Sequence, residues 1–210
     1  MFDLSLMITS FTQPKKAVEL AGFELGSGLK FAFIAMLVLL VIKAVVALIL
    51  ALIEGTPLIG GIALTLQASI FELLIVLASI LLMGFTAAFT AKALYQGTGD
   101  AGKTTGALSL ITAPIFFFGI LAQLVFILSS LLGPGTAVIF YWVLQIITLI
   151  SALFTLFIAV NAIWKASNTT FLGAIVSTII ALIPALIAST ILVWIAIIVI
   201  PGFSLAAGLV

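Results

Sequence analysis

Long apolar runs alternate with short polar turns along most of this 210-residue chain. A helix needs about 20 mostly apolar residues to cross a bilayer. The pattern therefore predicts an all-α bundle of five transmembrane helices, at approximately residues 29–53, 69–95, 106–132, 136–164 and 171–200. The segment before the second span, "GTPLIGGIALTLQ" (55–67), is interpreted as an outer loop or an interfacial segment. Pro201 and Gly202 close the fifth span.

The composition supports a membrane location. The chain is 65% hydrophobic and 6% charged, whereas soluble domains carry about 25% charged residues. Cysteine and histidine are absent, which excludes disulfides, Cys/His metal sites and catalysis by either residue type. We therefore predict no enzymatic activity, metal or cofactor. A net charge of +1 without a basic cluster gives no reason to expect nucleic-acid binding.

The lysines predict the orientation of the five spans. Six of the seven fall on the side that holds the N-terminus and the second and fourth connecting loops: Lys15, Lys16, Lys30, Lys92, Lys103 and Lys165. Because positive residues near span ends mark the cytoplasmic face, we predict a cytoplasmic N-terminus and an outside C-terminus in the cell membrane of a prokaryote. Residues 1–28 form an amphipathic segment, either a frayed lead-in or a membrane-sensing helix that starts near Thr12 and Pro14.

The loop at 97–104, "GTGDAGKT", fits the phosphate-loop template G-x-x-x-x-G-K-[ST] through Gly97, Gly102, Lys103 and Thr104. A working phosphate loop follows a buried β-strand, but here the preceding residues, "FTAAFTAKALYQ", have the composition of a membrane helix. We therefore do not expect nucleotide hydrolysis. Binding of a lipid phosphate or another anion beside Lys103 stays open.

The block "ALYQGTGDAGKTTGALSLITAPIFFF" (93–118) resembles the Ypt/Rab-interacting (Yip) membrane protein family. Gly97, Gly99 and Gly102 match the family's glycine-rich cytoplasmic turn, and Ala113-Pro114 matches its proline element. "TQPKKAVEL" (12–20) and "IAVNAIWKASNTTFLGAIV" (158–176) resemble further family segments.

This resemblance implies five spans, a cytoplasmic N-terminus and a role as a scaffold in membrane organisation. Family members with a known role act in vesicle trafficking and bind small GTPases through a long N-terminal region. That region is almost absent here, so a GTPase partner is implied by the resemblance alone.

Several polar residues lie inside the predicted spans. Lys43 is near the middle of the first, and Glu72 is its expected partner, with Glu54 as the second choice. Such a pair serves either packing or an ion pathway. Gln123 and Gln145 lie at similar depths in the third and fourth spans and are expected to hydrogen-bond across the helices, although a polar substrate site is an alternative.

Proline and small residues mark expected kinks and packing surfaces. Pro114 and Pro184 are expected to kink the third and fifth spans, because proline removes a backbone donor. Two ridges of small residues indicate close helix approach: Gly84, Ala88 and Ala91 in the second span, and Ala181, Ala185 and Ser189 in the fifth.

Two functions fit these features. The first is a membrane scaffold or partner-binding subunit, with the lipid bilayer and other membrane proteins or a second copy as partners. Its exposed cytoplasmic loop at 97–104 would contact a partner. The alternative is a small-solute or ion transporter that uses Lys43, Glu72 and the kinked helices. Five spans do not divide into two equal repeats of the kind that many transporters contain.

Overall fold

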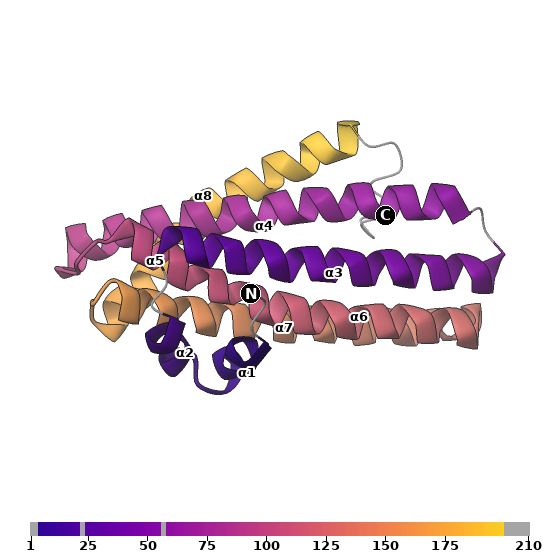
Figure 1. The fold of residues 1–210 in the computed structure, drawn as a ribbon, viewed down its shortest axis with the longest axis horizontal. Coiled ribbons are helices and arrows are strands. Elements are labelled where there is room, and N and C mark those ends of the chain that lie inside the picture. The colour runs from indigo at the N-terminus through magenta and orange to yellow at the C-terminus, as the bar shows by residue number, and fades with distance from the viewer. Residues whose placement is uncertain (1–3, 22–23, 56–57, 200–210) are drawn as a thin grey trace.

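The computed structural model describes residues 4–21, 24–55 and 58–199, and helices dominate throughout (Figure 1). Five helical segments are long and apolar enough to cross a membrane, as predicted. The helices are α1 (Leu4–Thr12), α2 (Pro14–Ala21), α3 (Leu25–Glu54), α4 (Leu58–Tyr95), α5 (Ala101–Leu108), α6 (Thr112–Leu132), α7 (Ala137–Ala166) and α8 (Phe171–Val199). Two short 3-10 turns, η1 (Ser109–Ile111) and η2 (Pro134–Thr136), complete the described elements.

The long helices run side by side along one axis (Figure 1). α3 packs between α4 and α6, and α7 packs against α6. α8 packs along α4, and Ala196 near the end of α8 is buried in a cluster with Leu64 and Phe71 of α4. One end of the bundle carries the 96–100 and 167–170 turns together with Lys92, Lys103 and Lys165, and is called the lysine end below. The expected end of the fifth span at Ile200, with Pro201 and Gly202, lies outside the described residues.

α4 begins earlier than the sequence pattern indicated. The expected start was residue 69, yet the helix is continuous from Leu58, so residues 58–67 are helical and not a loop. The expectation was wrong because Gly60 and Gly61 read as loop punctuation. Each helical glycine costs only about 1 kcal/mol relative to alanine, and the apolar residues around this pair favour continuation of the helix.

The third span is built from three pieces, α5, η1 and α6. The break lies where Pro114 predicts it: Pro114 has no N–H to donate to the Leu110 carbonyl, four residues earlier, and its ring crowds that carbonyl. Two side-chain hydroxyl groups donate hydrogen bonds to backbone carbonyls at the break. Ser109 Oγ donates to the Gly106 carbonyl at 2.6 Å, and Thr112 Oγ1 donates to the Ser109 carbonyl at 2.7 Å. In the fifth span, Pro184 lies inside the continuous α8.

α5 lies at the centre of the lysine end, in contact with α3, α4 and α7. Its residues from Thr104 to Leu108 are all buried. Two glycines allow this close approach. A Cβ added at Gly28 of α3 would lie 2.5 Å from the Cα atom of Gly106, and one added at Gly84 of α4 would lie 2.5 Å from the Cα atom of Thr105. Backbone therefore packs directly on backbone at this junction.

The ridges of small residues in α4 and α8 are buried. Ala88, Ala91, Ala181 and Ala185 are at most 4% exposed, and α4 and α8 pack against each other. Between them, the hydroxyl oxygens of Ser79 and Ser189 lie 3.1 Å apart. Small residues thus mark buried surfaces of both helices, and Gly84 of the α4 ridge approaches Thr105 of α5 closely.

α1 and α2 form an arm that folds onto α6 and α7 (Figure 1). Met7, Ser10 and Ala17 of the arm are fully buried. Phe11 packs its ring edge-on against Phe117, with ring centroids 5.1 Å apart. Residues 1–28 were interpreted either as a frayed lead-in or as a membrane-sensing helix. The first interpretation does not fit residues 4–21, which form two packed helices.

Candidate functional site

The ion pair between Lys43 of α3 and Glu72 of α4 lies between the two ends of the bundle, far from either end. Their ammonium and carboxylate groups are in direct hydrogen-bonded contact, which confirms the predicted pairing. Lys43 precedes Glu54 by 11 residues and Glu72 follows Leu58 by 14. At 1.5 Å of rise per residue, Lys43 lies about 16 Å from the end of α3 and Glu72 about 21 Å from the start of α4. Both of these helix ends lie away from the lysine end. This depth is close to the middle of a hydrocarbon core about 30 Å thick.

The pair is only partly covered by the rest of the chain. The side chain of Lys43 is 18% exposed and that of Glu72 is 38% exposed. Glu54, the second candidate partner, accepts a hydrogen bond from the Ser130 hydroxyl at 2.7 Å instead. The structure therefore assigns Lys43 to Glu72 alone and leaves part of the Glu72 side chain on the outer surface of the bundle.

Gln123 and Gln145 lie at matching positions in the α6–α7 hairpin, 9 residues before Leu132 and 8 residues after Ala137. The expected hydrogen bond between them is not formed. Gln145 is exposed, whereas Ile147, two residues on, is buried. Two residues correspond to about 200° around a helix, so the Gln145 amide points away from the packed face of α7. The prediction of a cross-helix bond was wrong for this reason.

In the 97–104 segment, four backbone N–H groups already donate within the chain. The Gly97 N–H donates to the Ala91 carbonyl at 3.0 Å, and the Thr98 N–H donates to the Ser167 carbonyl at 2.8 Å. The Thr104 N–H donates to the Asp100 carbonyl at 2.9 Å. Gly99 has a positive φ of 64°, and its neighbour Asp100 caps α5.

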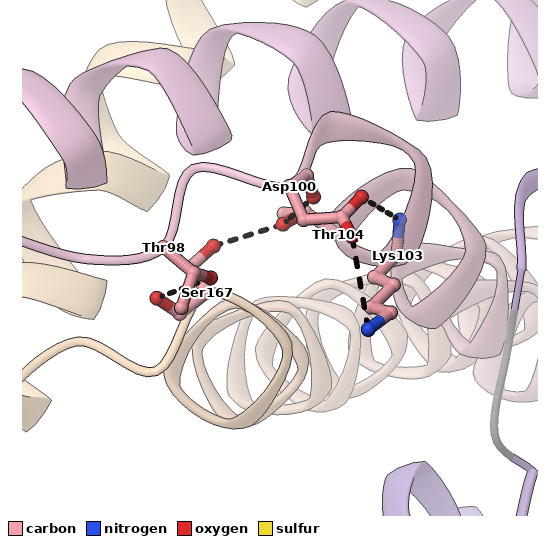
Figure 2. Close-up of polar contacts among 5 residues, drawn as sticks. All are labelled: Thr98, Asp100, Lys103, Thr104 and Ser167. Carbon is pink, nitrogen blue, oxygen red and sulfur yellow. Dashed lines mark hydrogen bonds and ion pairs between the residues drawn. The ribbon is translucent and has the colours of Figure 1, made fainter.

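The side chains of the segment are also engaged (Figure 2). Asp100 Oδ1 accepts the Lys103 N–H at 2.9 Å, and Asp100 Oδ2 lies 3.8 Å from Lys103 Nζ. Thr104, whose counterpart in a phosphate loop would hold magnesium, is fully buried and shares a hydrogen bond with Ser167 Oγ at 2.9 Å. The Asp100 carboxylate thus occupies the helix N-terminus at which a phosphate would bind.

A nucleotide-binding test follows from this geometry. We expect the purified protein to show no magnesium-dependent ATP or GTP hydrolysis, and Lys103→Ala to leave the fold intact, because the Lys103 side chain is 66% exposed and paired only loosely. Hydrolysis assays and circular dichroism check both points. Stoichiometric nucleotide binding that Lys103→Ala abolishes would contradict the expectation.

A cavity of about 460 Å³ opens beside this segment at the lysine end. Its polar lining residues come from α2, from the 98–103 segment, and from the end of α7 and the turn after it: Glu19, Thr98, Asp100, Lys103, Lys165 and Asn168. Lys165 Nζ donates to Glu19 Oε1 at 2.7 Å and so links α2 to α7. The hydrogen bond from Lys165 and its positive charge lower the pKa of Glu19 below the usual 4.5. The Glu19 carboxyl group therefore stays ionised at neutral pH.

Sequence reasoning identified Lys103 but missed Glu19, Asp100 and Lys165 as its neighbours in this cavity. The one local signal is the charged stretch "PKKAVE" (14–19), which is typical of a surface helix. Its glutamate, Glu19, is available to pair with a lysine from elsewhere in the chain. Comparison of the chain with protein-family models, curated proteins and solved structures found no match.

Proposed function

We propose that this chain is an integral membrane scaffold that binds a partner inside the bilayer. The observation that carries the proposal is the exposed Gln145 on α7. The surrounding exposed residues are apolar or aromatic, among them Trp142, Ile146, Leu149 and Leu153. A primary amide in hydrocarbon needs hydrogen-bond partners, and the Gln145 amide has none among the described residues. A polar residue on a partner helix would satisfy it.

Other features support the same proposal. Gln123 lies at a matching depth on the neighbouring helix α6, and the half-exposed Glu72 presents a second polar group inside the membrane. The glycine turn at 97–102 and Ala113-Pro114 resemble the Yip family, a scaffold-type family. We further propose that the lysine end faces the cytoplasm and that the chain resides in the cell membrane of a prokaryote, in accord with the positive-inside rule. A second copy or another membrane protein would supply the partner helix.

The test of the scaffold is copurification from native membranes with a matched control. Gln145→Leu is expected to weaken partner binding about threefold to thirtyfold and so to reduce recovery of a stable partner, since one intramembrane hydrogen bond contributes about 0.6 to 2 kcal/mol. Thr148→Val is the control, because Thr148 is also exposed on α7 but its hydroxyl already donates to the Leu144 carbonyl at 2.9 Å. Equal loss in both variants, or partner recovery unchanged in Gln145→Leu, would contradict the proposal.

The transporter is the second candidate, and the Lys43–Glu72 pair near the membrane centre favours it. A solute-uptake assay in proteoliposomes that contain this chain alone distinguishes the two functions. The scaffold proposal expects no solute uptake above that of empty vesicles. Uptake that is lost in Lys43→Met would reject the scaffold in favour of transport through the ion pair.

A further inference from the structure

The cavity at the lysine end is lined by two positive and two negative side chains. Lys103 and Lys165 contribute ammonium groups, and Glu19 and Asp100 contribute carboxylates. A cavity for a simple anion would have an excess of positive charge, and here the four charges cancel. The backbone N–H groups of Thr98, Lys103 and Thr104 beside the cavity already donate within the chain. The lining therefore favours a ligand that carries both signs of charge.

In each of the two ion pairs of the cavity, a charged group of a ligand can replace one of the partners. The side chains of Lys103 and Asp100 are 66% and 43% exposed, and their charged atoms are 3.8 Å apart. Those of Lys165 and Glu19 are 36% and 60% exposed. Exposed ion pairs contribute little net stability, so a ligand can replace each partner at low cost. Its anionic group would bind the lysines and its cationic group the carboxylates, through charge-assisted hydrogen bonds.

The cavity also lies at a level where lipid headgroups are expected. Trp164 directly precedes Lys165 on α7, and Tyr95 ends α4 just before the turn that contributes Thr98 to the cavity. Trp and Tyr concentrate at membrane–water interfaces. Lys15 Nζ lies 3.9 Å from the centre of the Trp164 ring, which places a further cation at this level.

From these observations we infer that the cavity binds the headgroup of a zwitterionic phospholipid, with the phosphate on Lys103 and Lys165 and a primary ammonium on Asp100 and Glu19. A volume of about 460 Å³ is within the range of small-molecule sites. Thr98 and Asn168, at the rim, offer neutral polar groups. This site is separate from the intramembrane partner surface around Gln145 and does not depend on it.

The test measures lipid binding to the full chain in detergent by native mass spectrometry. Phosphatidylethanolamine is compared with phosphatidylglycerol, which has the phosphate without the amine, and with a primary-amine lipid that lacks phosphate, all with the same acyl chains. Phosphatidylethanolamine is expected to bind about tenfold more tightly than either, as the loss of one charge-assisted hydrogen bond implies. Equal binding of phosphatidylglycerol and phosphatidylethanolamine would overturn the inference.

Paired variants assign the two halves of the headgroup. Lys103→Met with Lys165→Met is expected to remove the preference over the amine lipid, and Asp100→Asn with Glu19→Gln the preference over phosphatidylglycerol. Asparagine caps a helix as well as aspartate does, so the second pair keeps α5 intact. Lys16→Met is the matched control, because Lys16 is exposed on α2 but does not line the cavity.

Two further outcomes would reject the binding of a phospholipid headgroup in this cavity. If Lys16→Met weakens binding as much as the cavity variants, general surface charge explains the binding. If soluble glycerophosphoethanolamine competes as strongly as the lipid, the ligand is a soluble zwitterion and not a membrane lipid. Melting temperatures in detergent that match the unmodified chain show that each variant is folded.

Discussion

Glu72→Leu is expected to lower the free energy of unfolding by about 3 kcal/mol, because it leaves the ammonium group of Lys43 without its partner inside the bundle. Removal of one member of a fully buried pair costs about 3–5 kcal/mol. We expect a loss of unfolding free energy at the lower end of this range for two reasons. Glu72 is partly exposed, and the long side chain of Lys43 can extend toward an interface. Thermal or denaturant unfolding in detergent micelles measures it.

A double replacement separates charge from packing. Lys43→Met with Glu72→Leu removes both charges and keeps apolar volume, so the doubly substituted chain is expected to recover most of the lost stability. Glu54→Gln is the control, because Glu54 bonds to Ser130 near the opposite end of the bundle and its side chain is exposed. If the double variant is as unstable as Glu72→Leu, the effect comes from packing and not from an unpaired charge.

Gly28→Val is expected to be the most damaging single change at the lysine end. The Cβ of any residue larger than glycine would lie 2.5 Å from both Cα and the carbonyl oxygen of Gly106. Because these are backbone atoms, no side-chain rotation relieves the clash, and α3 must move away from α5. Overpacking of this kind costs about 1–3 kcal/mol or more, and we expect the upper end together with a loss of folded protein in detergent.

The neighbouring Gly26 offers a matched control in the same turn of α3. A Cβ at Gly26 would meet nothing within 4 Å. Gly26→Ala is therefore expected to be neutral or to stabilise by about 0.4–1 kcal/mol. Size-exclusion profiles and melting temperatures of the two variants give the comparison. Similar melting temperatures for Gly28→Val and Gly26→Ala would show that the junction tolerates separation of α3 from α5.

The features predicted correctly depend on strong local signals. Five apolar runs identified five spans, and Lys43 was paired with Glu72 because no other acidic residue lies at a comparable depth in the predicted spans. Pro114 marked the break in the third span because proline affects the backbone directly around it. These predictions need only the residue types and their positions along the predicted spans, and not the packing of the helices.

The remaining features depend on contacts between distant segments. Gly28 lies just outside the span predicted at 29–53, and nothing local links it to Gly106. The outward direction of Gln145 depends on which face of α7 meets α6. The charged cavity unites α2, the 98–103 segment and the end of α7, so its four charges are dispersed in the sequence. The pattern of residue types along the chain does not show which distant segments come into contact.

The bond between Thr104 and Ser167 has a consequence for how the chain is made. The two residues are 63 positions apart. At a synthesis rate of about 5–20 residues per second, Ser167 is added about 3 to 13 seconds after Thr104. During that interval the Thr104 hydroxyl lacks its Ser167 hydroxyl partner, and the Thr98 N–H lacks its acceptor, the Ser167 carbonyl. The lysine end is therefore completed only after the fourth span has been synthesised, whatever the order in which the spans enter the membrane.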